Sequence, residues 1–222
     1  FELHGETGYE EVEIDAGGRA LRSLKRIPPV SGNNLALTLD AKLQQITEQA
    51  FGDRKGALVA IDPKTGGILA LVSTPTYDPN LFVDGITPEN WKELNDHPSK
   101  PMVNRAINGA YPPGSTFKPF MALAALEMGK RTPNQAISDP GYFNFGNHQF
   151  RDDKKGGHGS VDMYKSIVHS CDTYYYMLAN DMGIDNIAKF MGSLGLGQRT
   201  GIDLGKDDSG ESKGVLPSQE WK

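Results

Sequence analysis

Apolar residues recur at helical spacing in several stretches of the chain. Between residues 115 and 128 they follow the three- and four-residue period of an amphipathic helix, which is therefore predicted there. The same spacing predicts helices over 161–168 and 173–182, and Gly183 directly after the second is a typical C-cap residue. Asp40 is a typical N-cap residue, so a further helix is expected to begin after it.

Alternating or continuous apolar runs predict strands elsewhere. Residues 7–14 and residues 35–39 each have the pattern of one strand. The runs 57–61 and 68–72 flank a segment of Asp, Pro, Lys, Thr and two Gly residues, which predicts a β-hairpin closed by a proline-glycine turn.

Segments rich in Pro, Gly and Asn separate these elements. Residues 74–110 are predicted to be mostly loop, and residues 130–160 are the least regular part of the chain. Two prolines and a Ser-Gly pair within 28–32 predict a hinge. The chain is therefore expected to divide into residues 1–33 and residues 34–222.

The start of the helix predicted from residue 115 has the chemistry of an activated nucleophile. Pro119 is tolerated only in the first turn of a helix, so Ser115 is expected at the helix start, near the positive end of the dipole. Lys118, three residues later, lies on the same face and is expected to contact the Ser115 oxygen directly. A serine hydroxyl needs a base beside it, and a lysine held neutral can serve. The alternative is an ordinary N-cap serine with a solvated lysine.

A second candidate lies at Ser170-Cys171-Asp172, between two predicted helices. A tight turn there presents the side chains of Ser170 and Asp172, and Asp172 is expected to cap the second helix. The alternative is a helix junction without a catalytic role.

These two motifs carry a resemblance to a known family. Ser-x-x-Lys followed by Ser-x-Asp is similar to the signature of penicillin-binding proteins and serine β-lactamases. Residues 104–118 resemble the transpeptidase domain of class B penicillin-binding proteins, and residues 4–10, 28–34 and 170–176 resemble the penicillin-binding protein 2 group. The resemblance implies an α+β fold with helices packed on an antiparallel sheet. It also implies that 1–33 ends a pedestal module and 34–222 begins the transpeptidase domain.

The third family motif, Lys-Thr-Gly, occurs in this chain at residues 64–66, upstream of Ser115. We interpret it as the turn of the predicted hairpin, because the family places its motif on a later strand and nothing after Lys118 matches it. That later strand supplies one oxyanion-hole N–H, a contribution of roughly 3–4 kcal/mol in comparable enzymes. The chain is therefore expected to be part of a longer protein and to be inactive by itself.

The resemblance implies a peptidoglycan D,D-transpeptidase without a catalytic cofactor. Ser115 would attack the D-Ala-D-Ala end of a stem peptide, and Lys118 would accept its proton. Ser170 would relay a proton to the leaving amine, and β-lactams would acylate Ser115 by mimicking D-Ala-D-Ala. Asp172 would bind Lys118 or the substrate amide. It stands where the family more commonly has Asn, and a carboxylate favours a charged Lys118, which works against its action as a base.

Three other functions fit parts of the pattern. A serine β-lactamase shares the motifs, but a pedestal-like N-terminal segment is not expected in that class of enzyme. A D,D-carboxypeptidase differs only in letting water resolve the acyl-enzyme. A scaffold that binds elongation partners needs no catalytic residues, whereas this chain keeps all four of them.

The irregular segment and the Ser-x-Asp turn supply four residues of types that bind zinc: Asp139, Asp152, His158 and Cys171. A glycine-rich loop such as 141–159 buries too little apolar surface to order itself, and a metal would tie it down. The alternative is that these are ordinary loop residues.

The resemblance to penicillin-binding protein 2 implies a zinc site of these residue types beside the turn, with Asp152 preferred to Asp153. With four protein ligands the zinc would be structural. His148 and His169 are reserve ligands.

Composition narrows the range of functions. The net charge is −5 without a Lys/Arg cluster, which argues against nucleic acid. Mean hydropathy is −0.47, and no apolar run reaches the roughly 18 residues of a membrane span. The single cysteine excludes an internal disulfide. The resemblance places the full-length protein on the periplasmic face of the inner membrane, with one N-terminal anchor. It implies as partners a membrane glycan polymerase and the rod-shape scaffold proteins of the elongation machinery.

Overall fold

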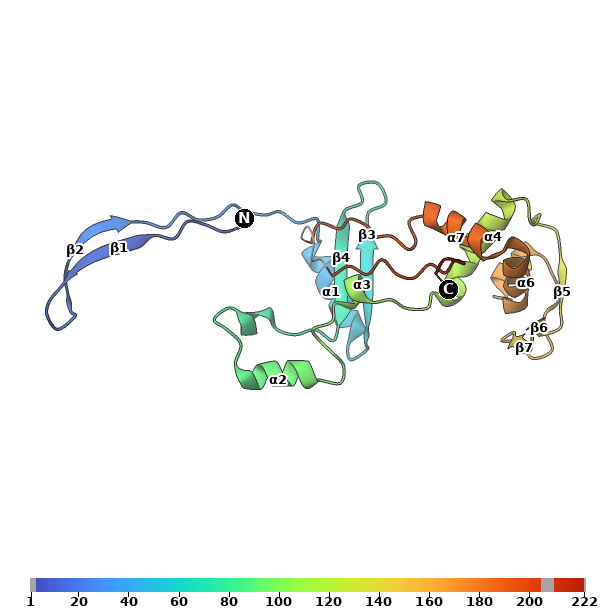
Figure 1. Cartoon of the computed structure of the whole chain (residues 1–222), viewed down its shortest axis with the longest axis horizontal. Helices are drawn as coiled ribbons and strands as arrows, with labels where there is room; N and C mark the ends of the chain where they lie inside the picture. Colours follow the sequence, from blue (N-terminus) through green and yellow to red (C-terminus); the bar gives the residue numbers. More distant parts are fainter. Residues whose placement is uncertain (1–2, 205–209, 222) are drawn as a thin grey trace. The chain divides into compact units, whose positions relative to one another are not determined.

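Two units make up the chain in the computed structural model, Phe1–Thr74 and Pro75–Lys222 (Figure 1). The structure describes residues 3–204 and 210–221. The boundary after residue 33 stays a prediction. Helices and antiparallel strand pairs occur in the chain, in agreement with the predicted α+β class.

The first unit contains two antiparallel hairpins and one helix. Strand β1 (Tyr9–Ile14) pairs with β2 (Ala20–Ile27), and β3 (Gly56–Ile61) pairs with β4 (Ile68–Thr74). Helix α1 (Ala41–Phe51) packs against β4.

Two predictions in this unit are confirmed. The Asp40 carboxylate caps α1 by accepting from the backbone N–H groups of Lys42 and Leu43 at 2.9 and 3.0 Å. The Lys-Thr-Gly sequence at 64–66 lies in the β3–β4 turn, which Gly66 closes by donating its N–H to the Asp62 carbonyl at 2.8 Å. This Lys-Thr-Gly is thus a turn.

The strand predicted over 35–39 is wrong. The Thr38 hydroxyl donates to the Ile68 carbonyl at 2.7 Å, and the N–H of Asp40, directly after the segment, donates to the Leu69 carbonyl at 2.9 Å. Leu35, Leu37 and Leu39 are exposed. An apolar pattern is not sufficient for a strand without a neighbour that supplies a ladder of backbone hydrogen bonds.

The second unit is mainly helical. Its helical segments are η1 (Pro79–Phe82), α2 (Pro88–Asp96), α3 (Arg105–Asn108), η2 (Gly114–Phe117), α4 (Lys118–Glu127), α5 (Met163–Val168), α6 (Asp172–Met182) and α7 (Ile184–Ser193). Within the described residues, every helix is too short or too polar to cross a bilayer.

Residues 130–160 are more regular than predicted. They contain β5 (Ile137–Asp139), β6 (Tyr142–Phe145), β7 (His148–Arg151) and the start of β8 (Gly159–Val161). Strand β5 pairs with β8, and the β6–β7 hairpin lies between them in sequence. Strands of three or four residues are too short for a two-residue period to be recognised in sequence.

The core of this unit lies where α4, α5, α6 and α7 meet. Its fully buried side chains from α4 and α6 include Ala124, Ala125, Tyr174 and Leu178. The same two helices carry the candidate catalytic residues at or next to their N-terminal ends, so the packing of this core fixes those residues relative to each other.

Candidate active site

Ser115 lies in the short 3-10 helix η2, directly before α4. The prediction of one continuous helix from 115 to 128 is corrected in this detail. Pro119 has no N–H to donate to the Ser115 carbonyl in an α-helical turn, so Lys118 N–H donates to that carbonyl instead. Pro119 stands in the first turn of α4, as predicted.

Lys118 is in contact with polar groups that the Ser170 turn and Asp172 supply. The residue is 9% exposed. Its Nζ donates to the backbone carbonyl of Ser170 and, at 2.9 Å, to the Ser170 hydroxyl. It also forms an ion pair with Asp172 Oδ1 at 2.6 Å. A buried ammonium requires such partners, because burial without them costs several kcal/mol, roughly.

Ser170 connects the nucleophile to the lysine. Its hydroxyl donates to Ser115 Oγ at 2.9 Å and accepts from Lys118 Nζ at the same distance. The predicted direct contact between Lys118 and Ser115 is wrong: within the described residues, no hydrogen bond runs from Lys118 Nζ to Ser115 Oγ. The two groups therefore communicate through the Ser170 hydroxyl.

The backbone of Ser170 is in the left-handed region, with φ of 53°. Few non-glycine residues adopt this conformation, which costs of order 1–3 kcal/mol and is common in active sites. Two backbone bonds hold it: Ser170 N–H donates to Ile167 O at 3.2 Å, and Cys171 N–H donates to Ser166 O at 3.0 Å. The turn thus aims both the hydroxyl and the carbonyl of Ser170 at Lys118.

Asp172 is the first residue of α6, and the prediction that it caps this helix is wrong. The cap comes instead from Asp152, whose Oδ2 accepts from the Thr173 N–H at 2.8 Å. The Asp172 carboxylate is thereby free to pair with Lys118. Asp172 stays near the positive end of the helix dipole, which suits its charge.

Tyr175 is a member of this site that the motifs did not indicate. Its ring centroid lies 5.7 Å from Lys118 Nζ, within the range of a cation–π contact. Its hydroxyl is hydrogen-bonded to the buried Ser166 hydroxyl at 3.1 Å. Tyr175 lies one helical turn after Asp172, so its helical spacing from the motif is the sequence signal that identifies it.

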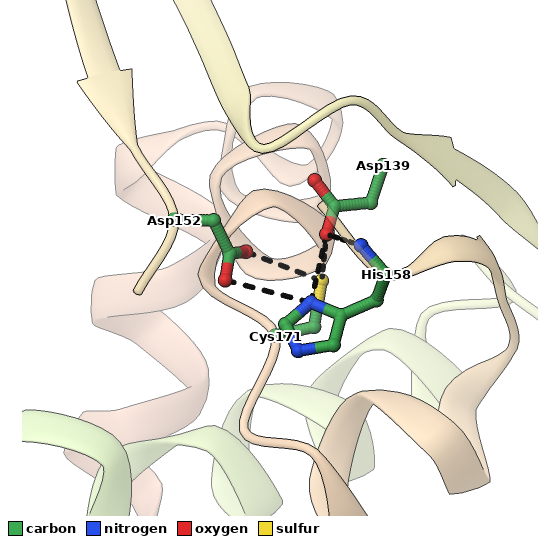
Figure 2. Close-up of side chains that lie close together, drawn as sticks. All are labelled: Asp139, Asp152, His158 and Cys171. Atoms are coloured by element: carbon green, nitrogen blue, oxygen red, sulfur yellow. Dashed lines mark hydrogen bonds and ion pairs between the residues drawn. The ribbon is translucent and has the colours of Figure 1, made fainter. Parts of the chain in front are cut away.

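The four residues predicted as zinc ligands lie together beside this turn (Figure 2). Their ligand atoms all lie within 4.8 Å of one another, and they come from the last residue of β5, the residue after β7, the residue before β8 and the residue before α6. They are Asp139, Asp152, His158 and Cys171.

Short contacts link these side chains. Asp139 Oδ2 lies 2.9 Å from His158 Nδ1, and the Cys171 sulfur lies 3.4 Å from one oxygen of each of Asp139 and Asp152. Of the reserve ligands, His169 stacks on His158 with ring centroids 5.7 Å apart, and His148 packs against Phe150. Neither belongs to the cluster.

The protonation of the cluster follows from its surroundings. Burial opposes the charge of Asp139, but hydrogen bonds from the backbone N–H groups of Gly141 and His158 and from the His158 ring outweigh it and lower the pKa of this carboxyl. Burial likewise opposes the charge of Asp152, but hydrogen bonds, first among them the one from Thr173 N–H, outweigh burial and lower the pKa of this carboxyl. Burial, and after it the adjacent carboxylates, raise the pKa of the Cys171 thiol to about 12. Two carboxylates, an imidazole and a thiol in contact fit a divalent cation, which would stabilise the thiolate.

The two sets of residues share one short segment. Cys171 stands between Ser170 and Asp172, and Asp152 binds the backbone of Thr173. The cluster therefore holds the turn that presents the candidate catalytic groups.

Comparison with known proteins identifies relatives along the whole chain. Residues 56–221 match the penicillin binding protein transpeptidase domain. The peptidoglycan D,D-transpeptidase MrdA of Acinetobacter baumannii is 52% identical over 99% of this chain and 32% of that protein. The protein of the same name from Escherichia coli K12 is 49% identical over 99% of this chain and 34% of that protein. The chain spans about a third of the length of these curated relatives.

The chain also resembles solved structures of penicillin-binding proteins. Pseudomonas aeruginosa PBP2 in complex with WCK 5153 is 44% identical, with a TM-score of 0.79, over 87% of this chain and 43% of that chain. The complex between Helicobacter pylori PBP2 and MreC is 35% identical, with a TM-score of 0.83, over 100% of this chain and 41% of that chain. These likenesses confirm the fold class inferred from the sequence.

Proposed function

Because this chain belongs to the penicillin-binding protein transpeptidase family, we propose that the protein containing it is a peptidoglycan D,D-transpeptidase of cell-wall elongation. The observation that carries the proposal is the position of the Ser170 hydroxyl, 2.9 Å from both Ser115 Oγ and Lys118 Nζ. The names of the most similar relatives support the same activity.

In the first step, Ser115 Oγ attacks the carbonyl carbon of the penultimate D-Ala. The hydroxyl proton of Ser115 moves toward Lys118, and the Ser170 hydroxyl is placed to relay it. The C–N bond to the terminal D-Ala then breaks, and the leaving amine receives a proton from the same relay. Lys118 accepts a proton only in its neutral form, so the ammonium that pairs with Asp172 must first release a proton to solvent as substrate binds.

In the second step, an amine of a neighbouring stem peptide attacks the acyl-enzyme. The ester bond to Ser115 breaks, the serine regains its proton and a cross-link forms. A D,D-carboxypeptidase uses the same residues but lets water attack. β-Lactams would acylate Ser115 in the first step and resist the second.

The Ser115 N–H is proposed as one donor of the oxyanion hole. The family resemblance assigns the second donor to a Lys-Thr-Gly strand, whereas the Lys-Thr-Gly of this chain is the β3–β4 turn in the other unit. The 222-residue chain is therefore proposed to be inactive by itself.

The cluster of Asp139, Asp152, His158 and Cys171 is proposed to bind zinc. A bound zinc would be held by four protein ligands and would link their segments, with no open position for catalysis. Its four ligands come from separate segments of the irregular region, so they would tie that region to the start of α6.

Peptidoglycan lies outside the inner membrane, so the protein is proposed to act on the periplasmic face of that membrane. The Helicobacter pylori relative was solved with MreC, and a further relative was solved in a peptidoglycan synthase complex of polymerization and crosslinking. By similarity, the proposed partners are a rod-shape scaffold protein and a membrane glycan polymerase. The scaffold role would then accompany catalysis.

The test of this function uses the protein that contains this chain, which we call the parent protein. It is labelled with a fluorescent penicillin. Labelling that disappears in Ser115→Ala supports the proposal, and unlabelled, folded parent protein would overturn it. Rapid turnover of the penicillin would instead favour a serine β-lactamase. Release of D-Ala without cross-linked product when an acceptor amine is present would favour the carboxypeptidase.

A further inference from the structure

The β6–β7 hairpin presents a row of aromatic rings on one face. Its strands pair Phe143 with Phe150 and Phe145 with His148. Directly paired residues, and residues two apart on one strand, share a face of a β-ribbon. We call these four side chains, together with Tyr176 of α6, the aromatic face.

Tyr176 joins the aromatic face from the neighbouring helix. Its ring centroid lies 5.5 Å from that of Phe150 and 6.4 Å from that of Phe143. The hairpin and α6 lie beside each other in the fold (Figure 1). The aromatic face therefore rests on the helix that begins with Asp172.

The aromatic face is only partly covered by this packing. Phe145 is 60% exposed and Phe150 is 38% exposed. The opposite face of the hairpin is polar, with the Gln149 amide donating to the Asn144 side chain at 3.2 Å. Exposing apolar rings is costly at about 25 cal/mol per Å², so rings grouped in this way indicate a binding surface.

The aromatic face is continuous with the candidate active site. Tyr176 lies one helical turn after Asp172, on the same side of α6. At its other end, β7 leads into Asp152, which binds the first turn of α6. A ligand on the aromatic face therefore lies against the helix that positions the catalytic groups.

The shape and surroundings of the aromatic face favour a polysaccharide. Flat rings stack on the C–H faces of sugar rings, and the exposed basic residues Lys154 and Lys155 follow the hairpin. Such cations suit a polymer that carries carboxylates. A stable protein interface buries about 800 Å² on each side, more than a hairpin of two four-residue strands with part-covered rings presents.

We propose that the aromatic face binds the glycan strand of the donor peptidoglycan, with sugar rings stacked on Phe145 and Phe150. This inference rests on the proposed transpeptidase function and deepens it. It predicts that the enzyme prefers a stem peptide carried on a glycan to the same peptide alone.

The test compares two donors in the parent protein: a free stem pentapeptide, and the same pentapeptide attached to a glycan strand. Phe145→Ala and Phe150→Ala are each expected to lower kcat/KM about tenfold for the glycan-linked donor, the effect of losing one ring contact. Activity on the free peptide and acylation by penicillin are expected to stay unchanged. Phe145→Leu, which keeps apolar bulk without a ring, is expected to behave like Phe145→Ala.

Trp91→Ala is the matched control, because Trp91 is an exposed aromatic residue of α2. It should leave both donors unaffected. Direct binding of a peptide-free N-acetylglucosamine oligomer should weaken in the two Phe→Ala variants and not in the control.

Equal loss on both donors, or no loss on either, overturns the inference. Full activity of Phe145→Leu beside an impaired Phe145→Ala also overturns it, because it points to a hydrophobic protein partner. Absence of penicillin acylation in the unsubstituted parent marks failure of the proposed function itself. That result is distinct, since the aromatic-face variants play no part in it.

Discussion

The Ser170 hydroxyl lies between the Ser115 hydroxyl and the Lys118 ammonium, 2.9 Å from each. Ser170 is therefore more than a distant second motif, because it completes the hydrogen-bond chain from the nucleophile to the lysine. Its backbone, at a φ of 53°, is held in place for this role.

Replacing Ser170 by Ala is predicted to slow acylation of the parent protein by penicillin about 10²–10⁴-fold, the usual range for losing a proton-transfer group. The measurement is the second-order acylation rate. Ser160→Ala, which removes an exposed hydroxyl of β8, serves as control. An unchanged rate in Ser170→Ala would show that protons bypass this hydroxyl.

Lys118→Arg is predicted to abolish acylation, because arginine stays protonated and cannot act as a base. The matched control is Lys165→Arg, an exposed position on α5. Circular dichroism would verify that both variants fold. Acylation of Lys118→Arg at the rate of the control would remove Lys118 from the role of base.

Asp172→Asn is predicted to keep acylation within about tenfold of the unsubstituted rate, because an amide oxygen still accepts from Lys118 Nζ and a single neutral hydrogen bond is worth roughly 1 kcal/mol. Asp172→Ala is predicted to lose more, since it leaves the buried ammonium without this partner. Acylation rates of the two variants decide the matter. If Asn proved as damaging as Ala, the negative charge itself would be required.

Metal analysis of the purified parent protein is predicted to find zinc, and Cys171→Ser is predicted to lose it. Removing the metal should lower the melting temperature, by about 2–4 °C for each kcal/mol lost in a unit of this size. His148→Ala is the control, because His148 lies outside the cluster. Zinc content that is the same in Cys171→Ser and His148→Ala would remove the proposed site.

The metal-free protein is predicted to lose stability as the pH falls below about 4, the ordinary range of carboxyl groups. Asp139 and Asp152 both have a pKa below the ordinary value of 3.8. The unfolded chain therefore binds more protons at acid pH. This contribution to stability is fully present above the unfolded pKa and disappears as the pH falls through the lowered, folded values. Urea unfolding between about pH 3 and pH 6 would measure this loss of stability, because ordinary carboxyl pKa values are about 4. A free energy of unfolding that rises toward the acid end of this range would contradict the prediction.

Much of the site could be predicted from local patterns. Pro119 fixed the start of α4, and the spacing of apolar residues located α6 and its end at Gly183. Residue chemistry, together with the family resemblance, selected Asp139, Asp152, His158 and Cys171, which the structure brings together.

The errors concern contacts between segments that are distant in sequence. Asp172 had the composition of a helix cap, but Asp152, brought in by β7, supplies the cap. Residues 35–39 had the pattern of a strand, but they form no strand and are bonded to β4 by the Thr38 hydroxyl, which donates to the Ile68 carbonyl. The relay through Ser170 likewise depends on how the turn before α6 folds against α4, which local sequence does not specify.

Intact-mass analysis of the parent protein after incubation with benzylpenicillin, followed by peptide mapping, tests the central claim most directly. One penicilloyl group on Ser115, absent from Ser115→Ala and formed slowly in Ser170→Ala, is the predicted result. A folded protein that carries no adduct, or carries it on another residue, would contradict the account.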